Sequence, residues 1–208
     1  MEEVWKKQFN KRAFLDIPEY KKSFWTKEGH QQLHDVTISL VEKLRNVRTI
    51  LDVGCGPGKY CKTLTDKGYD VLGVDYSENQ IELAKQKYPQ LRFMVANGYE
   101  LPFENNSFDV SISIGALQCL VDHKKFINEL IRVSSKAIIL CTLLSEKKSN
   151  DPMKTLKEQL KTDSFPCREY HPSELLPIFQ DAKMTISVIT TFNNEKILDG
   201  YFIVARKL

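Results

Sequence analysis

A glycine-rich turn between a buried strand and a helix is the stretch of this sequence best suited to binding a nucleotide-like ligand. Gly54, Gly56 and Gly58 fall within five residues and follow the apolar run Thr49–Val53. Glycine lacks a Cβ, so its backbone can adopt positive φ and approach a ligand closely. The helix expected from Lys59 would direct free N–H groups and the positive end of its dipole toward a ligand above the turn.

The spacing of these glycines excludes two common phosphate-binding loops. In the dinucleotide pattern G-x-G-x-x-G, the third glycine would fall at Lys59 or at Cys61. A P-loop ends in Gly-Lys-Ser/Thr, whereas Gly58 and Lys59 are followed by Tyr60. The turn is therefore not suited to enclosing a pyrophosphate.

An acidic residue ends the next strand along the chain. Residues Asp70–Asp75 form a second apolar run, and Asp75 closes it. This residue lies about twenty positions after the turn, where in doubly wound folds a carboxylate can accept hydrogen bonds from vicinal ribose hydroxyls. The turn and Asp75 together predict a ligand that contains a nucleoside.

The elements that must position these residues alternate between strand and helix. The pattern predicts parallel strands near 49–53, 70–75, 91–96, 108–114 and 136–143, with helices between them. A last helix near 172–182 precedes two β-rich runs, 185–192 and 197–205, joined by a turn at 193–196. We therefore expect a Rossmann-like, doubly wound α/β fold: a mostly parallel, seven-stranded sheet with a C-terminal antiparallel hairpin and an N-terminal helical cap.

This organisation predicts a single domain with four parts. They are a helical cap over 1–46, a cofactor-binding core over 47–143, a lid-like insertion over 144–172, and the last helix and hairpin over 173–208. The first part is rich in aromatic residues, and we expect it to cover the ligand.

Composition and charge set limits on the partners of the protein. The net charge of +3, from 30 basic and 27 acidic residues, gives no basic stripe for nucleic acid. No apolar run is long enough to cross a bilayer, and we expect neither a signal peptide nor a membrane partner. Five cysteines without C-x-x-C spacing predict reduced thiols in a cytoplasmic protein and no metal site.

Four short motifs in order resemble those of the class I S-adenosylmethionine-dependent methyltransferases. They occupy 51–58 (Leu-Asp-Val-Gly-Cys-Gly-Pro-Gly), 73–77 (Gly-Val-Asp-Tyr-Ser), 97–103 (Asn-Gly-Tyr-Glu-Leu-Pro-Phe) and 107–110 (Ser-Phe-Asp-Val). The set is most similar to the type 11 group, many of whose members act on small molecules. The resemblance implies S-adenosyl-L-methionine as cofactor and in-line transfer of its methyl group to an O, N, S or C nucleophile of a small molecule.

The resemblance also implies which residues hold the cofactor. The expected residues are Asp52, Gly54, Cys55, Gly56 and Gly58 at the methionine part, Asp75 and Tyr76 at the ribose and adenine face, Asn97 and Gly98 at the adenine edge, and Ile114 and Gly115 at the methionine ammonium. Many relatives have Asp where this chain has Asn97. An amide oxygen can still accept a hydrogen bond from the adenine amino group.

The methyl acceptor is less clearly specified by the sequence. We expect Tyr20 and Trp25 of the aromatic segment, together with Gln118 after the fourth strand, to contact it. Relatives often have His at the position of Gln118, and an amide cannot act as a base. Where the nucleophile carries a proton that it cannot lose easily, a base is needed. The four histidines are then the candidates: His171, before the last helix, ranks first, ahead of His30, His34 and His123.

Two alternative functions stay open at this point. One is methylation of a macromolecule, either protein or RNA, although the near-neutral charge counts against RNA. The other is a non-catalytic module that keeps the fold for binding alone, which would predict a damaged cofactor site. The oligomeric state does not follow from the sequence.

Overall fold

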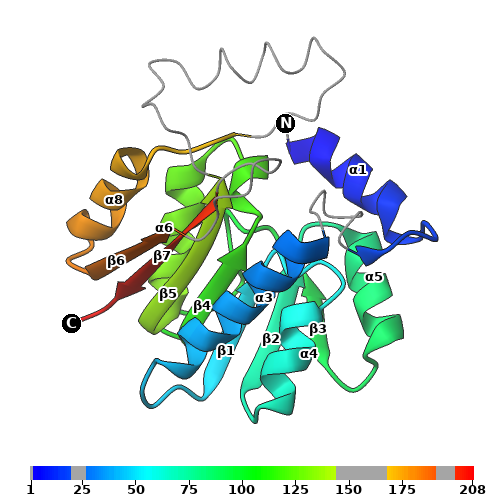
Figure 1. The fold of residues 1–208 in the computed structure, drawn as a ribbon, viewed down its shortest axis with the longest axis horizontal. Helices are drawn as coiled ribbons and strands as arrows, with labels where there is room; N and C mark the ends of the chain where they lie inside the picture. The colour runs from blue at the N-terminus through cyan, green and yellow to red at the C-terminus, as the bar shows by residue number, and fades with distance from the viewer. Residues whose placement is uncertain (1, 20–26, 144–167, 191–199) are drawn as a thin grey trace.

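A seven-stranded sheet forms the centre of the computed structural model, which describes residues 2–19, 27–143, 168–190 and 200–208 (Figure 1). The strand order is β3-β2-β1-β4-β5-β7-β6. The bounds of the strands are β1 Thr49–Val53, β2 Asp70–Asp75, β3 Arg92–Val95, β4 Phe108–Ile114, β5 Ser134–Leu143, β6 Thr185–Thr190 and β7 Gly200–Arg206. Strands β1 to β5 pair in parallel, and β7 runs antiparallel to both β5 and β6. The Rossmann-like doubly wound fold and its C-terminal antiparallel pair are thereby confirmed, while the turn predicted at 193–196 lies outside the described residues.

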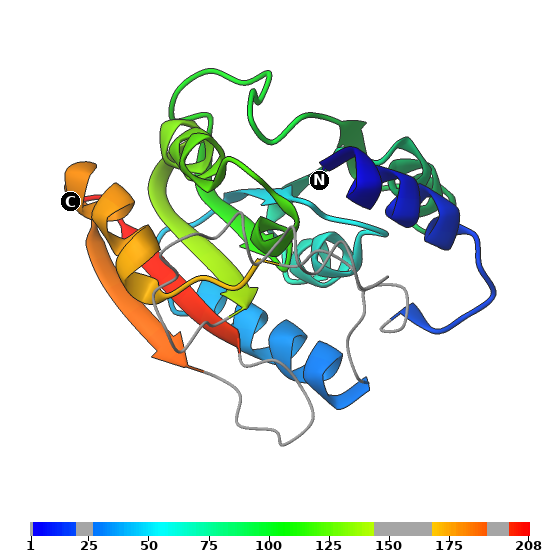
Figure 2. The same cartoon turned by 90° about the horizontal axis from the view of Figure 1, so that it is seen from above.

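Helices cover both faces of the sheet, as the two views show (Figures 1 and 2). One face packs against α3 (Lys27–Glu42), α4 (Lys59–Asp66) and α5 (Glu78–Lys87), and the other against α6 (His123–Val133) and α8 (Pro172–Asp181). Successive side chains of a strand point to opposite faces. Ile50 therefore joins the first apolar cluster and its neighbour Leu51 joins the second, and both are fully buried.

The ligand-binding end of the sheet follows from the strand order. The chain runs outward from β1 through β2 to β3 and then returns to the centre for β4. Helices that leave adjacent strand ends in opposite directions open a crevice at such a switch point. The crevice lies beyond the carboxyl ends of β1 and β4, where the glycine turn and Gly115 are found.

The N-terminal helix α1 (Glu2–Ala13) lies against α5 (Figure 1). Several hydrogen bonds join the two helices. Asn10 Oδ1 accepts hydrogen bonds from Ser77 Oγ and from Asn79 N at 3.3 Å, and Gln80 Nε2 donates to the carbonyl oxygen of Phe9 at 3.0 Å. These bonds connect α1 to the start of α5, directly after Asp75, although the two segments are far apart in the sequence.

Part of the predicted cap and most of the predicted lid lie outside the described residues. These are 20–26 and 144–167, which include Tyr20, Trp25 and Cys167. The chain is described again from Arg168, and Tyr170 N donates to the carbonyl oxygen of Leu143 at 3.0 Å. The fifth strand begins at Ser134 rather than at Lys136, because Ser134 pairs with Phe108 of β4 directly after α6 ends at Val133.

Candidate active site

The glycine turn adopts a backbone that few other residues could take. Gly54, Gly56 and Gly58 have φ of 82°, 51° and 83°. A Cβ at Gly54 would lie 2.7 Å from the Cβ of Ala116, on the loop after β4. The N–H groups of Gly54 and Cys55 donate to the carbonyl oxygen of Val74 at 2.8 and 3.0 Å. At Gly54 the turn therefore places no side chain between itself and the loop after β4, and two hydrogen bonds fix it to the end of β2.

Asp75 connects the turn to the start of α5. Its Oδ2 accepts a hydrogen bond from Gly56 N at 2.9 Å, and its Oδ1 accepts one from Ser77 N at 2.8 Å. Burial raises the pKa of Asp75, while the hydrogen bonds that its carboxylate accepts from backbone N–H groups oppose that shift. Each carboxylate oxygen has a second lone pair, so the group retains acceptor capacity for ligand hydroxyls.

A cavity of about 470 Å³ lies over these strand ends. This volume is within the range of small-molecule sites, roughly 300–1,000 Å³. It brings together most of the residues predicted from the sequence: Gly54, Cys55, Gly56, Asp75, Tyr76, Asn97, Gly98, Ile114, Gly115 and Gln118. Residues from the ends of β1, β2, β3 and β4 therefore meet in one space.

Asp52 and Gly58 support the turn from behind and do not line this cavity. The Asp52 side chain is buried on the α4 face, where Oδ2 accepts a hydrogen bond from Cys61 Sγ at 3.4 Å and Oδ1 has no hydrogen-bond partner among the described residues. Burial raises the pKa of Asp52 to about 7. A Cβ at Gly58 would lie 2.6 Å from the ring of Phe93, so this glycine lets α4 approach the sheet.

Asn97 and Gly98 occupy the loop after β3. Asn97 Oδ1 accepts a hydrogen bond from Tyr99 N at 3.0 Å, which fixes the orientation of the amide. A Cβ at Gly98 would lie 2.5 Å from the Phe126 ring, so only glycine fits between α6 and the cavity. Tyr99 Oη accepts hydrogen bonds from the N–H groups of Val121 and Asp122, both at 3.1 Å, which join this loop to the start of α6.

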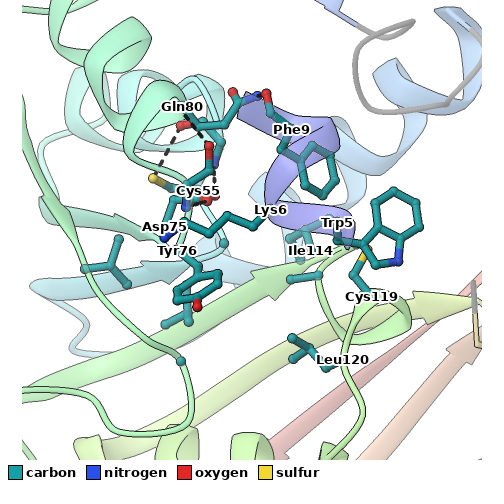
Figure 3. A pocket seen from close by; sticks show the side chains of 18 of the residues that line it. Trp5, Lys6, Phe9, Cys55, Asp75, Tyr76, Gln80, Ile114, Cys119 and Leu120 are labelled. Carbon is teal, nitrogen blue, oxygen red and sulfur yellow. Dashed lines mark hydrogen bonds between the residues drawn. The ribbon is translucent and has the colours of Figure 1, made fainter. Parts of the chain in front are cut away.

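Helix α1 contributes cavity residues that the sequence-based site assignment missed. Trp5, Lys6 and Phe9 line the cavity with Ile114, Cys119 and Leu120 (Figure 3). Trp5 is buried and stacks on Phe9 with ring centroids 5.3 Å apart. The Lys6 ammonium lies 4.2 Å from the centroid of the Tyr76 ring, and Tyr76 Oη donates to Glu3 at 2.8 Å. The four-residue spacing of Trp5 and Phe9 is the signal that could have indicated them.

Gln118 is a buried amide in the cavity wall. It lies in the short 3₁₀ helix η1 (Leu117–Cys119), and its Oε1 has no hydrogen-bond partner within the described ranges of the chain. The carbonyl oxygen of Gln118 accepts a hydrogen bond from Arg168 N at 2.9 Å. The backbone is therefore held in place while the buried amide oxygen retains unused acceptor capacity.

The structure does not bring His171 into the cavity wall. His171 is the N-cap of α8: its Nδ1 accepts a hydrogen bond from Ser173 N at 3.3 Å, and the Glu174 carboxylate accepts one from His171 N at 3.0 Å. The capping box accounts for a histidine at the position just before α8. Of the four histidines, His30 is the one that lines the cavity, and its Nδ1 lies 3.2 Å from Lys59 Nζ.

The cysteine environments favour packing over reactivity. Cys55, Cys61, Cys119 and Cys141 are buried. Burial raises the pKa of the Cys55 thiol well above its usual range despite the nearby helix start. In the parts of the chain that the structure describes, no three His, Cys, Asp or Glu side chains are grouped to hold a metal ion. The described helices also include none with the length and apolar character needed to span a membrane.

Comparisons with known proteins agree with this geometry. Residues 51–141 match the family described as a methyltransferase domain. A probable S-adenosylmethionine-dependent methyltransferase of Mycobacterium tuberculosis is 25% identical over 167 residues, which cover 80% of this chain and 60% of that protein. A demethylmenaquinone methyltransferase of Bacillus licheniformis is 34% identical over 111 residues, covering 50% of this chain and 47% of that protein. The chain thus spans less than two thirds of the length of these relatives.

Solved structures share the fold over most or all of the chain. The magnesium protoporphyrin IX methyltransferase of Synechocystis PCC 6803, with S-adenosylhomocysteine bound, superposes with a TM-score of 0.77 at 19% identity and covers 100% of both chains. The YcgJ protein of Bacillus subtilis has a TM-score of 0.68 at 18% identity, covering 86% of this chain and 98% of that one. Residues 51–141 thus match the methyltransferase domain family, and the chain shares the fold of the class I S-adenosylmethionine-dependent methyltransferases.

Proposed function

We propose that this protein transfers the methyl group of S-adenosyl-L-methionine to an O, N, S or C nucleophile of a small-molecule acceptor by in-line displacement. The observation that carries the proposal is one cavity shared by the glycine turn, Asp75, the Asn97–Gly98 loop and an apolar wall that includes α1. The first three provide acceptors and bare backbone for a nucleoside and an amino acid. The last leaves room for a second molecule.

The residues present fit this cofactor. Gly54 and Gly115, at the ends of neighbouring strands, both have positive φ, of 82° and 78°. With no Cβ on either residue, backbone groups face the space where an amino-acid moiety would lie. Asp75 keeps acceptor capacity for two ribose hydroxyls, and Asn97 with Gly98 would meet the adenine edge. Asp52 and Gly58 would act indirectly by holding the turn.

When bound, the cofactor supplies an activated methyl group on a sulfonium. The chain's own residues then have to align the acceptor and exclude water from the space between the two molecules. Alignment of this kind can contribute about 7–11 kcal/mol to lowering a barrier. Trp5 and Phe9 from α1 lie in the wall of the cavity and would limit the entry of water.

The wall of the cavity supports a largely apolar acceptor with one hydrogen-bond donor. Side chains of Trp5, Phe9, Ile114, Leu120 and Leu143 contribute the apolar surface. The Gln118 amide oxygen is buried without a partner among the described residues, and an unsatisfied buried acceptor is costly. An acceptor O–H or N–H directed at Gln118 would satisfy it. Tyr20 and Trp25 stay predicted acceptor contacts, because both lie outside the described residues.

A methyl-transfer screen against a metabolite library, read out by S-adenosylhomocysteine formation, tests this proposal. We expect product with one class of apolar small molecule carrying a hydroxyl or amine. Turnover only with added protein or RNA would instead support a macromolecular acceptor. Cofactor binding without turnover on any acceptor would support a non-catalytic module.

A further inference from the structure

Two basic side chains face each other in the cavity wall beside the glycine turn. Lys59 is the first residue of α4 and directly follows Gly58, while His30 belongs to the first turns of α3. Lys59 Nζ and His30 Nδ1 are 3.2 Å apart, and both residues line the cavity. The pair therefore lies where α3 and α4 meet, directly after the glycine turn.

The chemistry of this contact fixes what the pair can offer to a ligand. An ammonium group has hydrogen-bond donors and no acceptor, so His30 Nδ1 must accept from Lys59. A neutral imidazole that accepts at Nδ1 carries its proton on Nε2. Burial, followed by the Lys59 charge, lowers the pKa of His30 to about 4, so the ring is neutral near pH 7. The two side chains thus present N–H donors and one positive charge.

The other charged groups nearby are already engaged with neighbouring residues. The remaining basic side chain in the cavity wall, Lys6, forms an ion pair with Glu78 at 2.7 Å and lies over the Tyr76 ring. Glu19 also lines the cavity and forms an ion pair with Lys87 at 3.5 Å. Burial lowers the pKa of Lys59, and the charges of Glu19 and Asp35 oppose this shift. A half-buried ammonium of this kind gains from an anionic partner.

We propose that Lys59 and His30 bind the α-carboxylate of the cofactor's methionine moiety, an inference that rests on the function proposed above. The amino-acid end of that ligand carries an ammonium and a carboxylate. The ammonium is assigned to backbone groups at the end of β4, around Ile114 and Gly115. The carboxylate then needs donors on the other side of the turn, where Lys59 and His30 supply them.

The test is a double comparison of protein and ligand by titration calorimetry. The ligands are S-adenosylhomocysteine and its decarboxylated analogue, which lacks only the carboxylate. For the wild type, loss of the carboxylate should weaken binding about 10- to 100-fold, the range of a charge-assisted hydrogen bond. In Lys59→Met the two ligands should bind within about threefold of each other, because the group that tells them apart is gone.

Three further variants complete the test. Lys59→Arg keeps the charge and should retain the preference for the carboxylate ligand, and His30→Gln should reduce that preference in part. Lys62→Met, on the same helix but paired with Asp66 at the surface, should behave as wild type. The proposal is overturned if Lys59→Met weakens both ligands equally or changes neither. Failure of the wild type to bind either ligand would instead overturn the proposed function.

Discussion

The backbone N–H of Gly56 donates a 2.9 Å hydrogen bond to Oδ2 of Asp75, so the turn after β1 and the acid that ends β2 form one unit. A ligand that binds the Asp75 carboxylate therefore also affects the position of the turn. The second carboxylate oxygen extends the unit to Ser77 at the start of α5. Because Ser77 and its neighbours also bond to α1, cofactor binding and the position of α1 are structurally linked.

The glycine turn can be tested by comparing two glycines with similar backbones. Gly68 has a φ of 91° and open space where a Cβ would lie, so Gly68→Ala should cost about 1–2 kcal/mol of unfolding free energy. Gly54 adds a 2.7 Å contact with the Cβ of Ala116. Gly54→Ala should therefore cost about 1–3 kcal/mol more and abolish S-adenosylhomocysteine binding. Urea unfolding and calorimetry measure both effects, and equal costs with unchanged binding would contradict the account of the turn.

Asp52 should give the protein a distinct pH dependence. Its carboxyl keeps its proton up to a pKa of about 7 in the fold, whereas the unfolded chain loses it near pH 4. The native state then binds more protons in this interval, so unfolding free energy falls as the pH rises from about 4 to about 7. Asp52→Asn removes this term. Between pH 4 and pH 8, the unfolding free energy of the variant should therefore rise relative to that of the wild type by about 2–4 kcal/mol.

The control for this experiment is Asp66→Asn, because Asp66 is an exposed carboxylate on α4. Urea unfolding of both variants at several pH values separates the loss of a buried carboxyl from the loss of an exposed one. A difference between Asp52→Asn and the wild type that does not change with pH would contradict a raised Asp52 pKa in the fold.

The polar contacts between α1 and α5 should control how fast the cofactor product leaves. Asn10→Ala removes the acceptor for Ser77 Oγ and for Asn79 N. Individual hydrogen bonds contribute about 0.5–1.5 kcal/mol, so S-adenosylhomocysteine should dissociate about 3- to 10-fold faster. Stopped-flow fluorescence can follow this release, and Lys7→Ala, an exposed position on the same helix, is the matched control. Identical release rates in both variants would show that α1 does not limit exit.

Gln118 should affect the acceptor and leave the cofactor almost untouched. Gln118→Leu keeps a similar volume but loses the buried amide oxygen. With an acceptor identified by the library screen, kcat/KM should fall about tenfold or more, while the dissociation constant for S-adenosylhomocysteine stays within about twofold. A parallel loss of cofactor affinity would place Gln118 at the cofactor instead.

Local patterns predicted the sheet and most of the cavity because they are properties of short segments. Glycine spacing, the acid at the end of β2 and the alternation of strands with helices each depend on neighbouring residues. Alternation along β1 places the Asp52 side chain on the α4 face, outside the cavity wall, so its expected role of orienting the turn and approaching the methionine ammonium stays a prediction. His171 caps α8 and lies outside the cavity wall, so its expected catalytic role also stays a prediction.

The contribution of α1 could not be predicted in the same way. Trp5 and Phe9 form an amphipathic stripe that identifies a helix, but only the tertiary contacts with α5 show which surface the stripe covers. The contact between His30 and Lys59 likewise joins residues from two separate helices. Long-range pairings of this kind depend on how the helices pack.

Binding of S-adenosylhomocysteine, measured by titration calorimetry, tests the central claim most directly. We expect one site per chain in the wild type and in Asp70→Ala, whose changed side chain lies at the opposite end of β2. Asp75→Ala should bind at least about tenfold more weakly, because the ribose hydroxyls and the turn both lose their acceptor. Circular dichroism would confirm that both variants are folded. No binding by the wild type, or equal affinity in folded Asp75→Ala, would contradict the account.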